Sequence, residues 1–240
     1  TSLNNLDFLQ PVIAVERNLV IAGNESLSEL SAFDLLETVG HDFYLEGNRL
    51  EDFSSLHQLK NVGGSLIIRE YNALTSLAGL ENLDSIGGTL ELGACPYLHD
   101  LKGLDSLTSI GGDLLLLGLD SLSSLKGLED LASIGGALVV SSYNLKLPNL
   151  TGLDSLKSVG QNVLIQGNGN MTNLKGLENL DSVGGRFTVS YNAILSNCIV
   201  ESLCGQLDVS PDSVFIEFNA PGCNSTAEVK AQCDLPPGQC

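Results

Sequence analysis

A 24-residue period runs through most of the chain and constrains its fold more than any other feature. The repeated phrase is G-L-acid-x-L-x-S-(Ile/Val)-G-G-x-L-x-I, seen with conservative changes in segments 79–92, 103–116, 127–140 and 176–189. A fixed period of this size is typical of stacked coils, in which each repeat buries its apolar side against its neighbours. We therefore expect an elongated solenoid with its functional residues on the repeated outer faces.

Recurring glycines set the alignment of the coils. They stand 23 to 25 residues apart, at Gly40, Gly63, Gly87, Gly111, Gly135, Gly160 and Gly184. A short apolar strand follows each, and two more strands lie at 19–21 and 214–216. The predicted strand centres are Val20, Tyr44, Ile67, Glu91, Leu115, Val139, Leu164, Thr188 and Phe215. About nine coils of ~24 residues, with parallel strands ~4.8 Å apart, give a β-solenoid roughly 40 Å long.

Alternation within each strand sends its flanking residues, such as Leu90 and Leu92, into the core. We expect the glycines before each strand to allow a sharp turn with positive φ. An inward Asn row, whose amides would bond turn backbone from coil to coil, comprises Asn24, Asn48, Asn168, Asn192 and Asn219. Tyr71, Cys95, Leu119 and Tyr143 interrupt this row. Cys95 is interpreted as a small buried side chain, not a reactive thiol.

The two ends differ from the middle, as solenoid ends must. Residues 1–14 are expected to cover the first coil, 15–195 to form the repeats, and 196–240 to form a Cys-rich cap that includes the last strand. Short helices are expected at 196–207 and 225–233.

Five of the six cysteines lie in the last 43 residues, which is typical of disulfides in an oxidising compartment. Cys198 and Cys204 lie on different sides of the first predicted helix, so each is expected to pair outward, with Cys223 or Cys233. The sequence does not determine which of the possible disulfide pairings forms, or whether Cys240 takes part in a disulfide. A metal site is not favoured because no CxxC pair or neighbouring His occurs, and no cofactor is expected.

The net negative charge of the chain limits the kinds of partner that it can bind. A net charge of −18, from 29 acidic and 11 basic residues, repels nucleic acid and anionic membranes. No apolar run approaches the ~18 residues that span a bilayer. Together with the cysteines, this predicts a secreted or cell-surface protein.

The spacing departs from that of an ordinary leucine-rich repeat. Leu90 comes four residues after Ile86, and Leu27 three after Asn24, one more in each case than in that pattern. The phrase L-x-x-L-x-x-(I/V)-G-x-x-L-x-I-x-x-N-x-x-L instead resembles the receptor L-domain family, over about residues 15–195. The tail CNSTAEVKAQC is also similar to the caps of secreted bacterial proteins with such repeats.

This resemblance implies a right-handed parallel β-helix of leucine-rich character that acts as a recognition module, as in the insulin and EGF receptor ectodomains. The repeats here are more regular than in the animal receptors, and no separate Cys-rich module accompanies them. The resemblance therefore implies a fold and a general role, but no particular ligand.

The outward strand row is the candidate binding site, because seven of its nine residues are apolar or aromatic and parallel sheets are rarely left bare. The residues expected to carry it are Tyr44, Ile67, Leu115, Leu117, Val139 and Leu164. A protein or glycan ligand, or a second copy of the chain in a homodimer, would cover this face. The alternative is simple β-propensity, since branched residues suit any strand.

Two further rows follow the period. One is acidic, from Asp34 to Glu178, and is interpreted as a solvated face, with a row of bound cations as the alternative. The other consists of hydroxyl residues just before the glycines, where side chains bond corner backbone.

Two other functions stay open. A β-helix enzyme acting on polysaccharides would use paired carboxylates, and Asp42, Glu46, Glu91 and Asp113 lie outward near Arg69. A passive spacer is the third possibility. No nucleophile elbow, phosphate loop or dinucleotide fingerprint occurs, so we expect a non-catalytic protein.

Overall fold

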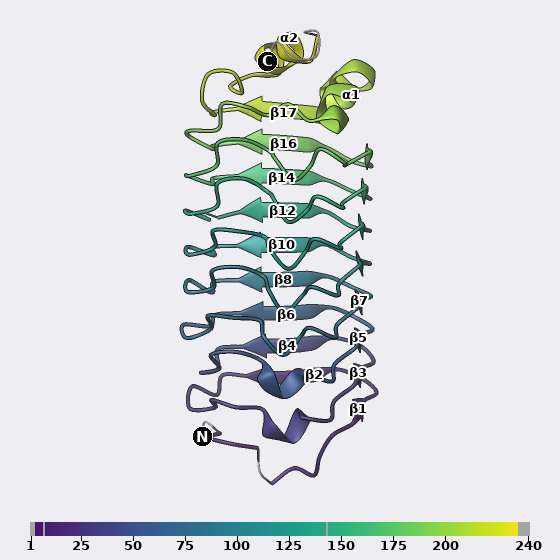
Figure 1. Ribbon diagram of the computed structural model, residues 1–240, viewed down its shortest axis with the longest axis vertical. Coiled ribbons are helices and arrows are strands. Elements are labelled where there is room, and N and C mark those ends of the chain that lie inside the picture. Colours follow the sequence, from purple (N-terminus) through teal and green to yellow (C-terminus); the bar gives the residue numbers. More distant parts are fainter. Residues whose placement is uncertain (1–2, 7, 143, 235–240) are drawn as a thin grey trace.

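Two parallel sheets run the length of the stack in the computed structural model, which describes residues 3–6, 8–142 and 144–234 (Figure 1). The larger sheet has nine strands in the order β17-β16-β14-β12-β10-β8-β6-β4-β2. Its strands are β2 (Leu19–Ala22), β4 (Phe43–Glu46), β6 (Leu66–Arg69), β8 (Leu90–Gly93), β10 (Leu114–Leu117), β12 (Leu138–Ser141), β14 (Val163–Gln166), β16 (Phe187–Ser190) and β17 (Val214–Glu217). All nine predicted strand centres fall inside these strands, so the predicted parallel β-solenoid is confirmed.

The smaller sheet forms a corner of the coil and has eight two-residue strands, paired in chain order. They are β1 (Ala14–Val15), β3 (Thr38–Val39), β5 (Asn61–Val62), β7 (Ser85–Ile86), β9 (Ser109–Ile110), β11 (Ser133–Ile134), β13 (Ser158–Val159) and β15 (Ser182–Val183). The predicted hydroxyl row lies in this sheet, and β15 is its last strand because a helix replaces the next coil.

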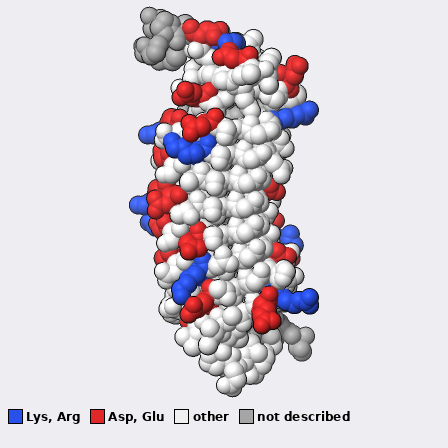
Figure 2. Space-filling model, turned by 90° about the vertical axis from the view of Figure 1, so that its right-hand side faces the viewer, with Lys and Arg blue, Asp and Glu red and all other residues white. Residues whose placement is uncertain are grey.

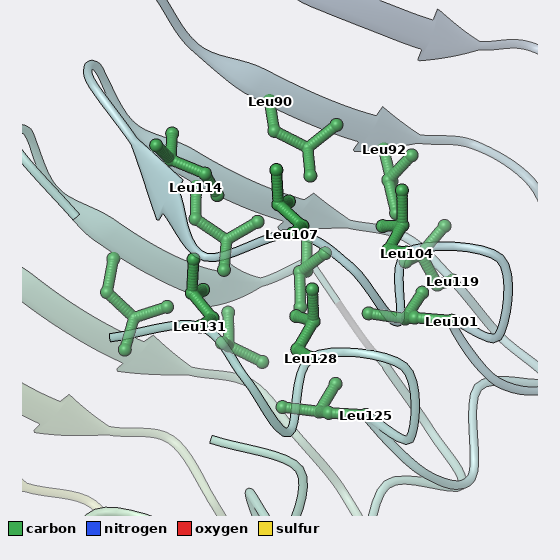
Figure 3. Close-up of a cluster of buried hydrophobic side chains, with 14 of the residues drawn as sticks. Leu90, Leu92, Leu101, Leu104, Leu107, Leu114, Leu119, Leu125, Leu128 and Leu131 are labelled. Atoms are coloured by element: carbon green, nitrogen blue, oxygen red, sulfur yellow. The ribbon is translucent and has the colours of Figure 1, made fainter. Parts of the chain in front are cut away.

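Leucines stacked at the coil period fill the interior. Leu104 and Leu107 repeat as Leu128 and Leu131 in the next coil, and all four are fully buried. Figure 3 shows these side chains meeting the inward residues of the strands, such as Leu90. Because burial of one leucine stabilises a fold by about 1.5–3 kcal/mol, this repeated packing is the main force that holds the coils together.

The glycines before the strands have a different role from the one predicted. Gly63, Gly87 and Gly111 do not have positive φ. An added Cβ at Gly87 would overlap the backbone carbonyl of Gly63 in the preceding coil, and the same relation joins Gly111 to Gly87. These positions therefore require glycine because successive coils approach too closely there for any side chain.

A buried Asn ladder ties the later coils together. The side chain of Asn144, which the sequence alignment missed, donates to Asn168 Oδ1 at 3.0 Å and to the carbonyl of Ser141. Asn144 lies one residue further along its coil than the other members, because the step from Gly135 to Gly160 is 25 residues. Tyr143, the predicted interruption in this coil, lies outside the described residues, whereas Tyr71, Cys95 and Leu119 are buried in the row as expected.

The C-terminal end is closed by helices and disulfides. The helices are α1 (Glu201–Val209) and α2 (Thr226–Cys233), and 3-10 turns occur at η1 (Ser31–Phe33), η2 (Ser54–Leu56) and η3 (Pro211–Ser213). Helix α1 begins later than predicted because residues 196–200 still follow the coil, with Asn197 bridged to Asn173. Both helices pack against β17.

The predicted outward pairing of the cysteines is confirmed, as Cys198–Cys223 and Cys204–Cys233. Cys240 lies outside the described residues.

At the other end, Leu6 is buried in the core and the Leu3 N–H donates to Asn24 Oδ1 at 3.2 Å. Residues before β1 therefore cover part of the first coil. None of the helices in the described part of the chain is long and apolar enough to cross a membrane.

Candidate functional site

Five of the six predicted outward residues lie in one row across the nine-stranded sheet, and Leu117 lies in the next outward row. Tyr44 is in register with Ile67, Leu115 with Val139, and Val139 with Leu164. Glu91 lies between Ile67 and Leu115 and divides the row. The register therefore brings the predicted residues together in two neighbouring groups.

Exposure differs along this row. Leu115, Leu117, Val139 and Leu164 are all partly exposed, so they offer apolar surface to a partner. Ile67 is only 7% exposed. Its register neighbours Tyr44 and Glu91 carry long side chains on both sides, so Ile67 adds little to the accessible face.

Charge gathers at one point of the sheet, on β4, β6 and β8. Arg69 Nε donates to Glu46 Oε2 at 2.8 Å, and Arg69 Nη1 lies 3.8 Å from Glu91 Oε1. The hydrogen bond to Glu46 raises the pKa of Arg69, with smaller charge contributions from Glu46 and Glu91. Glu46 and Glu91 are therefore partners of one guanidinium, in an ion-pair cluster on the outer face of the sheet.

The other two acids of the enzyme hypothesis hold neighbouring coils together. Asp42 Oδ1 accepts a hydrogen bond from the Ser65 N–H at 2.8 Å. Asp113 Oδ1 accepts one from the Ala137 N–H at 2.6 Å. Since Thr89 Oγ1 accepts from the Asp113 N–H in the same way, this position before the strand is a structural brace, and its side chains need only an acceptor oxygen.

The acidic row also has a structural role, beyond the solvated face that was predicted. Glu81, Asp105, Glu129, Asp154 and Glu178 each accept a hydrogen bond, at 2.6 to 2.9 Å, from the N–H of the glycine two residues earlier. Those glycines have φ between +105° and +116°. The G-L-acid phrase therefore forms a turn in which the acidic side chain accepts a hydrogen bond from the backbone N–H of the glycine that begins it. No cluster of ligating side chains suited to a metal ion occurs among the described residues.

The corner that carries the small sheet presents an uncharged surface. Figure 2 shows a band without charged side chains along the molecule, flanked by charged groups of both signs. The glycines of the close coil approach lie here, beside the hydroxyl row, in which Asn61 Nδ2 donates to Ser85 Oγ at 2.8 Å. This contact joins two members of the row within the stack.

The residues after the long strands share an unusual backbone conformation that the sequence did not reveal. One residue per coil has φ between +50° and +70°: Gly23, Gly47, Glu70, Ala94, Gly118, Ser142, Gly167, Tyr191 and Phe218. For the five that are not glycine this left-handed conformation costs about 1–2 kcal/mol each. Such strain often marks functional positions.

Hollows occur at these strand ends. One, of about 320 Å³, lies over Gly93, Ala94 and Gly118 and has Leu117 in its lining. A second lies over Gly167 beside Tyr191. Another hollow, of about 1080 Å³, lies away from these strand ends, between β15 and helix α1.

Comparison with known proteins shows a distant structural likeness. No family model matches it, and no curated protein matches it. A solved structure of an internalin from Listeria monocytogenes aligns over 86% of this chain and 75% of its own, with 19% identity and a TM-score of 0.37. The superposition is loose, so the assignment of a leucine-rich-repeat-like parallel β-solenoid rests on the strand register of the chain itself.

Proposed function

We propose that the protein is a non-catalytic recognition module, secreted or held at the cell surface, whose outward strand face binds a protein or glycan. The observation that carries the proposal is the in-register apolar row from Leu115 through Val139 to Leu164, which stays partly exposed to water. Contiguous apolar surface of this kind usually marks a contact site, and parallel sheets are usually covered on both faces.

Two features support the setting. The disulfides Cys198–Cys223 and Cys204–Cys233 favour an oxidising compartment. The resemblance of the repeat to the receptor L-domain supports a role in ligand binding, and the net charge of −18 argues against nucleic acid and anionic membranes as partners. A second copy of the chain is the alternative occupant of the face.

The test replaces Leu115 and Val139 together by Asp. These side chains are outward and only partly buried, so the double variant should fold, whereas a partner that covers them would have to bury two unpaired charges. Labelled protein is applied to protein and glycan arrays, and its mass in solution is measured by light scattering. We expect a bound partner, or a dimer, that the double variant loses.

The matched control carries Asp at Thr108 and Ala132, exposed positions of the same two coils on another side of the stack. It should behave as the natural chain. A partner retained by the Leu115/Val139 variant would exclude the strand face. A natural chain that is monomeric and binds nothing on either array would favour a passive spacer.

A further inference from the structure

An aromatic stack at the ends of β16 and β17 has one free face. Tyr191 and Phe218 follow these strands at equivalent positions, with ring centroids 4.7 Å apart and planes within 21°. This separation matches the spacing of ~4.8 Å between parallel strands, so the rings are stacked along the axis of the solenoid. Phe218 covers one face of Tyr191, and the other face is directed toward the preceding coil.

The preceding coil has glycine at the equivalent position, which leaves a slot. The hollow over Gly167 has a volume of about 530 Å³ and is lined by Ser141, Ser142, Gln166, Gly167 and Tyr191. None of these side chains is charged. The hydroxyls of Ser141 and Ser142 lie 3.4 Å apart, and the Gln166 amide has no side-chain partner among the described residues.

Stability does not explain the aromatic residues at these two positions. Tyr191 and Phe218 are 54% and 57% exposed, so their rings gain little from burial. Both hold φ near +55°, the left-handed conformation in which glycine is free of strain. An exposed aromatic ring on strained backbone is a recurrent mark of a binding site.

We propose that this slot binds one ring of a neutral glycan. The apolar C–H face of the sugar would stack on Tyr191 and continue the aromatic row, while its hydroxyls would bond Ser142 and Gln166. An aromatic side chain of a protein partner would stack equally well but would leave those polar groups unpaired. A charged group would find no opposite charge among the described residues of the lining.

The slot adjoins the proposed recognition face, because Gln166 and the outward Leu164 belong to the same strand, β14 (Val163–Gln166). The inference rests on the proposed function and assigns a ligand class to one edge of that face. A glycan held in the slot would extend across the apolar row beside it.

The test titrates the protein, by calorimetry and saturation-transfer NMR, with linear pentamers of glucose, mannose, galactose and N-acetylglucosamine. A galacturonic acid pentamer and the peptide Gly-Tyr-Gly serve as the charged and aromatic alternatives. We expect at least one neutral pentamer to bind and neither alternative to do so. Tyr191→Ala should weaken binding about tenfold, since ring stacking contributes about this much.

Gly167→Tyr is the sharpest variant, because it fills the slot with a ring of the chain itself, in a conformation that Tyr191 already adopts. It should abolish sugar binding. The matched control is Gly23→Tyr, at the equivalent position of the first coil, where φ is +66° and an added Cβ meets nothing within 4 Å. It carries the same backbone strain and should bind as the natural chain.

Three outcomes overturn the proposal: no neutral pentamer binds, the acidic pentamer or the peptide binds instead, or binding survives both Gly167→Tyr and Tyr191→Ala. If Gly167→Tyr fails to fold, Tyr191→Ala alone decides. If a partner found on the arrays is lost by the Leu115/Val139 variant but still binds Gly167→Tyr, the proposed recognition face is supported and the glycan slot is rejected.

Discussion

Asn168 Nδ2 donates to Asn192 Oδ1 across 3.2 Å, one full coil further along the stack, and the Asn168 N–H donates to the same oxygen at 2.9 Å. Asn192 repeats both contacts with Asn219. Each amide therefore links three successive coils, because its nitrogen also donates to a backbone carbonyl of the preceding coil; Asn192 Nδ2, for example, donates to the Ile165 carbonyl. The ladder satisfies buried polar groups that no water reaches.

Asn192→Ala should destabilise the protein by about 2–4 kcal/mol, because it leaves the buried Asn168 N–H without its acceptor and removes the amide donor from the carbonyls of Ile165 and Ser190. The midpoint of urea unfolding, followed by circular dichroism, measures the loss. Asn170→Ala, at an exposed position of the preceding coil, is the control and should change stability by less than about 0.5 kcal/mol. Equal effects at the two positions would mean that the ladder contributes nothing specific.

The G-L-acid turn gives a prediction about glycine. Gly127 has φ +112° and lies against the carbonyl of Leu101, so Gly127→Ala combines backbone strain with a clash. We expect a loss of more than about 2 kcal/mol in the free energy of unfolding. Gly205→Ala, in α1 with open space around its Cβ, should instead stabilise by about 0.5–1 kcal/mol. Thermal unfolding of both variants checks the contrast in sign.

The features that follow the 24-residue period could be predicted from the sequence. A feature that depends on a one-residue insertion in a single coil could not. Strand register followed from the spacing of Gly87 and Gly111, because a solenoid converts sequence distance directly into position. Asn144 was missed because one inserted residue moves it out of the common alignment while the backbone still brings it into the ladder.

The candidate site divides in the same way. Alternation placed Leu115 and Val139 outward from sequence alone. The slot beside Tyr191 was not predicted. The ring is oriented by a left-handed backbone conformation, and the equivalent positions of the other coils are occupied by glycine and by several other residue types, so no residue pattern marks it. The roles of Asp42 and Asp113 were hidden too, since an acid that braces backbone looks the same in sequence as an acid that catalyses.

Burial raises the pKa of the Cys95 thiol to about 11, outweighing the opposing backbone hydrogen bond. At pH 8 the native protein should therefore fail to react with iodoacetamide at this position, whereas urea-unfolded protein should react within minutes, because the thiolate is the nucleophile. Mass spectrometry of peptides checks the site. Rapid labelling of the native chain would contradict the buried placement.

The same shift predicts a pH dependence of stability. The unfolded thiol ionises near pH 8.5–9 while the folded thiol stays protonated to about pH 11. The unfolded state therefore loses its proton first, and stability falls between these two values as the pH rises. Burial raises the pKa of Tyr71 as well, which extends the loss to higher pH. Cys95→Ala should remove the contribution of the thiol to the slope between pH 9 and 11 and leave the contribution of Tyr71, which begins near pH 10.

The cap gives the last prediction. Cys204–Cys233 joins α1 to α2 across 29 residues, and a loop of that length contributes about 3–4 kcal/mol to stability in the chain-entropy model. Replacing both cysteines by Ser should release α2 first, because it packs on α1, on β17 and on the loop at Gly222 at the end of the stack, while the leucine core of the coils stays folded. Hydrogen exchange should then show fast exchange in α1 and α2 and unchanged protection in β8 and β10. Loss of protection throughout the stack would instead mean that the cap and the repeats fold as one cooperative unit.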